Sequence, residues 1–237
     1  MRPAMARMSA IFLLLVTATM AACGGSANAD DAAPTKAQAR AFAGAVNLTA
    51  TDVPGFKVSS EAKREHDTAA EKRLEHELLH CVHPASAKGL VEVGSKELER
   101  ESSAGYQVVQ SEVAVARSSA LAAKELAIIR SSHARGCMSH YLDLLLSGKY
   151  RGATFSPVSI AEGEPPASGV TGSFAWRISV AITAHGVRLP FYVDILGFVY
   201  GPAEVSLFAV GLPQPFPAAS EKRLFSLLLR RAKSHEI

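Results

Sequence analysis

The sequence predicts an α+β fold in which an antiparallel β-sheet meander packs against helices. Four strand-like runs separated by short turns occupy the chain from about residue 153 to residue 212. Helical patterns with apolar stripes precede and follow these runs, without the regular strand–helix alternation of a parallel sheet. About 200 residues after the N-terminal region are long enough for one core, and no second linker interrupts them.

The N-terminal half combines helices with short extended stretches. Residues 36–48 are alanine-rich and predict a short helix, and a turn at Pro54-Gly55 leads into a strand from Phe56. The stretch "TAAEKRLEHELLHCV" has apolar residues at helical spacing. Thr68 and Glu71 form a predicted capping box at its start, and Pro84 ends it.

The middle of the chain predicts one strand and two helices. In "YQVVQSEVAVARS", valines alternate with polar residues as in a strand. The following alanine- and leucine-rich segment predicts two helices, broken between residues 131 and 136 and ended near Gly148.

The C-terminal third predicts the meander and a closing helix. The runs are "ATFSPVSIAEG", "SFAWRISVAITAHG", "VRLPFYVDILGFVYG" and "AEVSLFAVGL". Pro190 lies within the third run, and a proline there implies a sheet edge or a bulge. "PQPFP" is interpreted as the connector to a helix that caps the sheet, in preference to a polyproline ligand.

The N-terminus has the pattern of an exported lipoprotein. Two arginines precede an apolar run from Ile11 to Met20, and small residues lead to Cys23. This resembles a lipobox, with methionine where leucine is usual. We expect a signal peptide at 1–22, acylation of Cys23 with chains such as palmitate, a flexible tether at 23–36 and a single extracytoplasmic domain at 37–237. The alternative is cleavage at an Ala-x-Ala-like site, which would give a secreted protein.

The charge balance does not favour nucleic acid as a partner. Without Arg2 and Arg7 of the signal, 23 basic residues face 22 acidic ones. No basic stretch is interleaved with aromatic residues that could stack on bases. The expected partners are therefore the membrane, through the lipid on Cys23, and a small ligand or an envelope protein.

Two cysteines remain after export, Cys81 and Cys137. In an oxidising compartment we expect them to form a disulfide. The alternative is a pair of metal thiolates, because histidines surround each cysteine and a Cys₂His₂ zinc site would be reasonable.

The stretch from His76 to His80 reads HELLH, the H-E-x-x-H signature of zinc proteases. Histidines at i and i+4 share a helix face and can hold one zinc, and the intervening Glu77 would act as general base. A catalytic zinc needs a third protein ligand, and the metzincin continuation is absent after His80. At 100° per residue the histidines point away from the core, so we interpret them as a solvated face without a cofactor; a zinc site at His76 and His80 is the alternative.

Other patterns are weaker. Asp194 is the one carboxylate in an apolar strand and could pair with Arg177 to bind a ligand, but we interpret it as an outward-facing residue. Trp176 is expected in the core. No nucleophile elbow or glycine-rich phosphate loop is present.

Several of these features together resemble a known group of proteins. The lipobox, "NLTATDVPGF", the paired cysteines, the meander and the closing "KRLFSLLLRRA" helix are similar to actinobacterial lipoproteins with PknH-like sensor domains. The resemblance rests on layout and covers most of the mature chain. It implies a PsbP-like α/β sandwich that binds a small ligand, lipid or partner, and it carries no catalytic residues.

The sequence thus favours a lipid-anchored, extracytoplasmic binding or sensor-like domain at the cell membrane, without enzymatic activity. Its ligand would bind in a cleft between sheet and helices. Two alternatives stay open: a membrane-anchored zinc metalloprotease using HELLH, and a purely structural envelope protein, which would have no apolar cleft.

Overall fold

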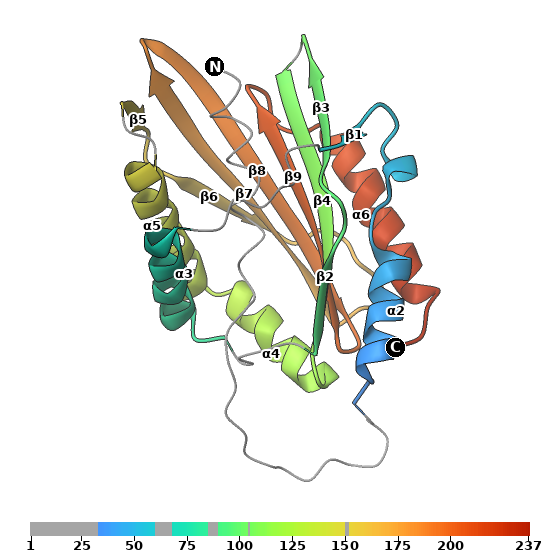
Figure 1. Ribbon diagram of the computed structural model, residues 1–237. Helices are drawn as coiled ribbons and strands as arrows, with labels where there is room; N and C mark the ends of the chain where they lie inside the picture. Colours follow the sequence, from blue (N-terminus) through green and yellow to red (C-terminus); the bar gives the residue numbers. More distant parts are fainter. Residues whose placement is uncertain (1–32, 60–67, 85–89, 104, 150–151) are drawn as a thin grey trace.

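The computed structural model describes residues 33–59, 68–84, 90–103, 105–149 and 152–237. In these residues five α-helices surround a nine-stranded sheet (Figure 1), and every strand pairing is antiparallel. The predicted α+β class is therefore confirmed. The signal segment, Cys23 and most of the expected tether lie outside the described residues. Among the described helices, none is both long and apolar enough to cross a bilayer.

The sheet has the order β1-β3-β4-β9-β8-β7-β5, with β2 also paired to β4 and β6 also paired to β7. The strands are β1 (Lys57–Val58), β2 (Val91–Gly94), β3 (Leu98–Ser102), β4 (Gly105–Val115), β5 (Ala153–Phe155), β6 (Ser159–Gly163), β7 (Gly172–Ala184), β8 (Val187–Tyr200) and β9 (Ala203–Leu212). Of the four runs in the predicted meander, the last three form β7, β8 and β9, and the first forms β5 and β6, which both pair with β7. β4 pairs with β9 along ten residues, so the N-terminal strands extend the same sheet.

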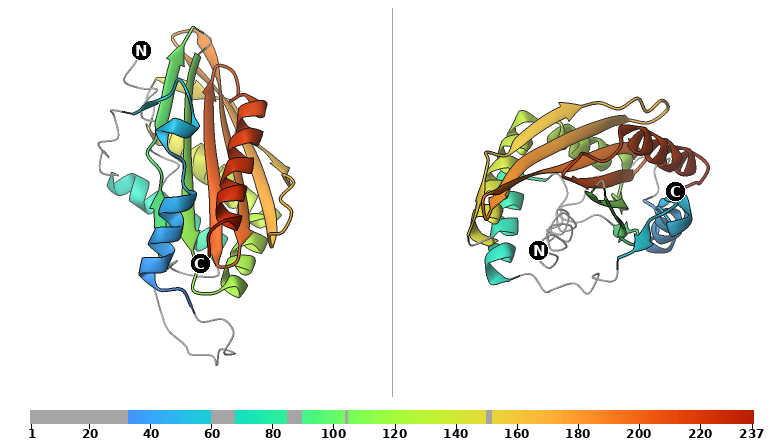
Figure 2. Two further views of the ribbon diagram at one scale, coloured as in Figure 1. Left: turned by 90° about the vertical axis from the view of Figure 1, so that its right-hand side faces the viewer. Right: turned by 90° about the horizontal axis from the view of Figure 1, so that it is seen from above.

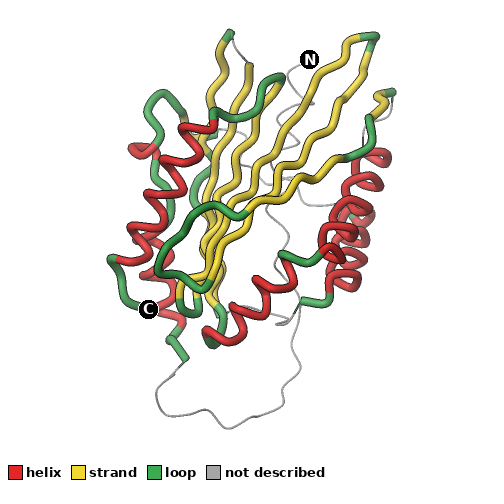
Figure 3. Tube along the Cα trace, turned by 180° about the vertical axis from the view of Figure 1, so that it is seen from behind, coloured by secondary structure: helices red, strands yellow, loops and turns green. Residues whose placement is uncertain are grey.

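Helices cover both faces of this sheet. They are α2 (Lys36–Val46), α3 (Ala69–Val82), α4 (Ser119–Ile129), α5 (Ser132–Lys149) and α6 (Ala218–Lys233). One group, α3, α4 and α5, lies on one side of the sheet, and α2 and α6 lie on the other, as Figures 2 and 3 show from further directions. The core accordingly has two parts, one between the sheet and each group of helices.

Local sequence signals explain where the helices begin. Thr68 accepts a hydrogen bond from the backbone N–H of Glu71, and the Glu71 carboxylate accepts one from the backbone N–H of Thr68, which is the predicted capping box. Thr35 and Gln38 form the same arrangement at α2. Because α2 begins at Lys36, the last residues of the expected tether already belong to the domain.

Pro190 lies at a local sheet edge, as predicted. It is opposite Ala181 of β7, whose backbone N–H and C=O are both bonded to Ser156. In an antiparallel pair, residues that do not bond each other direct their backbone groups outward. The nitrogen of Pro190 therefore faces the side of β9, where pairing begins only at Tyr192.

Two details of the strands differ from the sequence prediction. The stretch from Val91 to Ser102 forms β2 and β3, which were not predicted, and the run that begins at Ala153 is divided into β5 and β6. Both differences concern short strands with charged or polar residues. The two helices after β4 are separated at residues 130–131, at the start of the predicted break.

Candidate functional site: a cavity with a carboxyl cluster

A cavity of about 170 Å³ lies between the sheet and the helices α3, α4 and α5. Its walls are mostly apolar side chains, contributed by three helices and four strands. They include Leu78, Leu79 and Val82 of α3, Ala122, Ile128 and Ile129 of α4, Ala134 and Met138 of α5, and Phe174, Trp176, Ile195 and Phe208 of the sheet. This is the place between sheet and helices where the sequence led us to expect a cleft.

Strand alternation brings carboxyl groups to this cavity. In β4 the odd-numbered valines Val109, Val113 and Val115 pack toward α2 and α6, so the even-numbered Glu112 faces the cavity. Glu204 of β9 reaches the same cavity, because Glu112 is opposite Ser206 and Glu204 is two residues away. Neighbouring strands thereby place two acidic side chains on one face.

Four glutamates make up this carboxyl cluster: Glu92 of β2, Glu112, Glu125 of α4 and Glu204. Glu112 is only 6% exposed. Burial, the charges of Glu92 and Glu204 and a hydrogen bond with Glu92 raise the pKa of Glu112 to about 8. Burial and the charges of Glu125 and Glu92 raise the pKa of Glu204 to about 7, although the Ser206 hydroxyl donates a hydrogen bond to it at 3.3 Å.

Aromatic side chains form part of the cavity wall on β7. Trp176, the only tryptophan in the chain, is 7% exposed there and lies in the core as predicted. Gly197 of β8 leaves room for the ring of Phe174, since a Cβ atom at Gly197 would lie 2.3 Å from Cε1 of that ring. A larger residue at position 197 would therefore displace the ring of Phe174, which lines the cavity.

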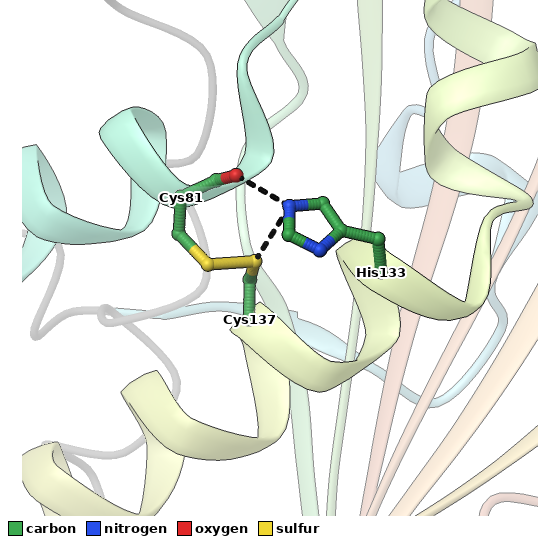
Figure 4. A group of neighbouring side chains, drawn as sticks. All are labelled: Cys81, His133 and Cys137. Carbon is green, nitrogen blue, oxygen red and sulfur yellow. Dashed lines mark hydrogen bonds between the residues drawn. A yellow bond between two sulfur atoms is a disulfide. The ribbon is translucent and has the colours of Figure 1, made fainter.

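Cys81 and Cys137 form a disulfide that joins α3 to α5, as the sequence predicted. Nε2 of His133 lies 2.8 Å from the carbonyl oxygen of Cys81 and 3.7 Å from Sγ of Cys137 (Figure 4). A carbonyl oxygen only accepts, so this nitrogen carries the proton and donates. Cysteine and histidine side chains can both bind metal ions, and these three lie close together. The two sulfur atoms are in a disulfide, however, and so are not thiolates, and a ring nitrogen that carries a proton has no lone pair to offer a metal. The alternative zinc site at the cysteines does not fit this arrangement.

The HELLH stretch lies on α3 with its polar residues outward. His76, Glu77 and His80 are exposed, and Leu78 is buried at 3% exposure. This confirms the predicted direction of the histidines. Within the part of the chain that the structure describes, no third histidine, cysteine or carboxylate gathers with His76 and His80. The ring of His80 has His83 as a neighbour, with 5.4 Å between their centroids, but His83 does not form a group of three possible ligands with His76 and His80.

Asp194 is not outward-facing, and that interpretation was wrong. Its strand is covered on both faces, here by α6, so the side chain is buried at 3% exposure. Nε of Arg177 donates to Oδ1 of Asp194 at 2.5 Å, and Nη2 of Arg177 lies 3.5 Å from Oε1 of Glu221. The suggested pairing of Arg177 with Asp194 is therefore present, on the face opposite the cavity, with the Asp194 side chain buried and the Arg177 side chain exposed.

Glu221 of α6 completes this second group. Burial, a hydrogen bond with Asp194 and the charge of Asp194 raise the pKa of Glu221 to about 8, and Arg177 acts in the opposite direction. Oδ2 of Asp194 and Oε1 of Glu221 have no hydrogen-bond partner among the other described residues. The negative charge of Asp194 therefore favours the protonated form of Glu221, and Arg177 balances part of the charge of this group.

Sequence reasoning did not identify Glu112 and Glu204 as site residues. In "QSEVAV" the polar residues look like the solvent side of a half-buried strand. The sequence did contain a signal, because helices both precede and follow the strands and can therefore cover both faces of the sheet. A sheet covered on both faces has no face exposed to solvent. Acidic residues at alternate positions of such strands must then point into a cavity or a polar cluster.

Comparison with known proteins adds no family to this description. No protein-family model matches the chain, and a search of the curated proteins finds no relative.

Proposed function

We propose that this protein is a lipid-anchored, extracytoplasmic binding or sensor-like domain that holds a small, largely apolar molecule and carries out no catalysis. The observation that carries the proposal is the cavity beneath α3, α4 and α5. A cavity of about 150 Å³ lined by aliphatic and aromatic side chains is large enough to bind benzene. A cavity of about 170 Å³ therefore has room for one substituted ring or a short branched chain.

The anchor in this proposal comes from the sequence, through the lipobox-like residues that end at Cys23. The preference for binding over proteolysis is supported by the position of HELLH on an exposed helix face. A catalytic zinc needs three protein ligands, and among the described residues neither His76 nor His80 belongs to a group of three possible ligands.

The test is binding of a neutral probe, tert-butylbenzene, followed by calorimetry and by the fluorescence of Trp176. We expect saturable binding at one site with a change in the Trp176 emission, because this indole lines the cavity. The variant Ala114→Leu adds a branched side chain at a lining position of β4 and should weaken binding at least tenfold.

The matched control is Ala184→Leu. It makes the same change in a strand, but at the end of β7 and away from the lining residues. It should bind as the parent does. Absence of saturable binding in the folded parent, or equal affinity in Ala114→Leu and the parent, would contradict the proposal and favour a purely structural protein.

A further inference from the structure

The charged residues that line the cavity are all acidic among the described residues. Glu112, Glu125 and Glu204 line it, and no lysine, arginine or histidine is among its described lining residues. Glu92, next to Glu112 on β2, adds a fourth acidic group. The described lining residues of α3 and α5 that face this cluster are all apolar.

A buried carboxylate needs a proton or a positive charge close to it. Moving an isolated carboxylate out of water is strongly unfavourable, so it either stays protonated or is compensated by a cation. None of the described residues that line the cavity supplies such a cation. In keeping with this, burial and the neighbouring acidic groups raise the pKa of Glu112 to about 8 and that of Glu204 to about 7.

The walls of the cavity suit the remainder of such a ligand. Trp176, Phe174 and Phe208 contribute aromatic surface. The faces of aromatic rings attract cations, and quaternary ammonium groups are recognised in this way. Apolar residues of α3 and α4 cover the other side, where an uncharged ligand body would be removed from water.

We propose that the cavity binds an organic cation, an ammonium group carried on a small apolar body, with the carboxylates of Glu112 and Glu204 as its counter-charges. This inference rests on the proposed binding function and names the class of its ligand. An anionic amphiphile such as a fatty acid is disfavoured at the same site, because its head group would add a further negative charge to the cluster.

The experiment compares two probes of nearly equal shape: phenyltrimethylammonium, whose charge does not change with pH, and neutral tert-butylbenzene. Affinities of the purified protein are measured by calorimetry at pH 6, 7.5 and 9. If the cation requires both carboxylates ionised, with pKa values of about 8 for Glu112 and about 7 for Glu204, its affinity should rise by up to about 1000-fold from pH 6 to pH 9, by competition with the proton. The affinity of tert-butylbenzene should change less than about threefold.

Variants assign the effect to the cluster. In Glu112→Gln the rise in cation affinity from pH 6 to pH 9 should be reduced to about tenfold, which is the part that Glu204 supports with its pKa of about 7. In the double variant Glu112→Gln/Glu204→Gln the rise should be absent. Both variants should still bind tert-butylbenzene, which shows that they fold. The control Glu221→Gln alters a carboxyl with an equally raised pKa on the opposite face, and it should keep the full rise.

The outcomes separate the two proposals. If tert-butylbenzene binds but the cation does not, or if the affinity for the cation is constant or falls with pH, the cation proposal is wrong and the binding function stands. If neither probe binds the folded parent at any pH, the binding function fails and the cation proposal fails with it.

Discussion

Reduction of the Cys81–Cys137 disulfide should cost a large part of the stability of the domain. The bond joins residues 56 positions apart, and cross-linking a loop of that length removes conformational entropy from the unfolded chain worth about 4 kcal/mol at 25 °C. Small globular domains have unfolding free energies of about 5–15 kcal/mol. Because α3 packs mainly on α5, reduction also removes the covalent link that holds the cavity wall in place.

The assay is urea unfolding of the protein with and without a thiol reductant, followed by Trp176 fluorescence and far-UV circular dichroism. With a denaturant slope of about 2 kcal/mol per molar urea, the loss corresponds to a decrease of about 2 M in the midpoint. The double variant Cys81→Ala/Cys137→Ala should unfold near the reduced midpoint and should not respond to reductant. A decrease under 0.5 M with an unchanged slope would refute the loop-entropy reasoning.

Three further predictions concern single positions. The pKa of Glu221 is raised to about 8, so the folded state holds more protons than the unfolded state between about pH 4.5 and 8, and stability falls as pH rises through that range. Glu221→Gln should flatten this fall, measured as the urea midpoint from pH 5 to 9. An unchanged pH profile would contradict the raised pKa of Glu221. Cys23→Ser should move the protein from the membrane fraction to the soluble fraction of an expressing cell, and persistent membrane association would argue against acylation at that residue. With zinc added, cleavage of a quenched peptide library should be the same for the parent and Glu77→Gln, and a parent activity that this substitution abolishes would establish the protease alternative.

The sequence predicted those elements whose pattern is local. Alternation in β7, β8 and β9 is regular enough to predict the meander, and the capping box of Thr68 and Glu71 identifies the start of α3 without tertiary information. The sequence did not predict β2 and β3, because both contain charged residues. Residues such as Glu92, Glu99 and Arg100 are usual in loops as well as in edge strands.

The candidate site could be predicted only in part. The export signal expected from the sequence implied that Cys81 and Cys137 would pair, since two cysteines in an oxidising compartment have one pairing, and the structure contains this disulfide. The positions of Glu112 and Asp194 depend on which helices cover which face, and this is determined by packing between segments distant in sequence. The alternation of a strand shows which residues share a face of the sheet, but it does not show whether helices cover one face or both.

Pro190 has a consequence for how copies of this protein meet one another. The N-terminal end of β8, from Val187 to Pro190, extends beyond Leu212, the last residue of β9, and Val187 at its tip is 48% exposed. An open strand edge of this kind can accept a strand from another molecule, which is a common route to aggregation. A proline offers no N–H to an incoming strand, so the overhang has one donor fewer where a second copy would attach. The residue that interrupts the strand pattern thus helps to keep neighbouring molecules apart.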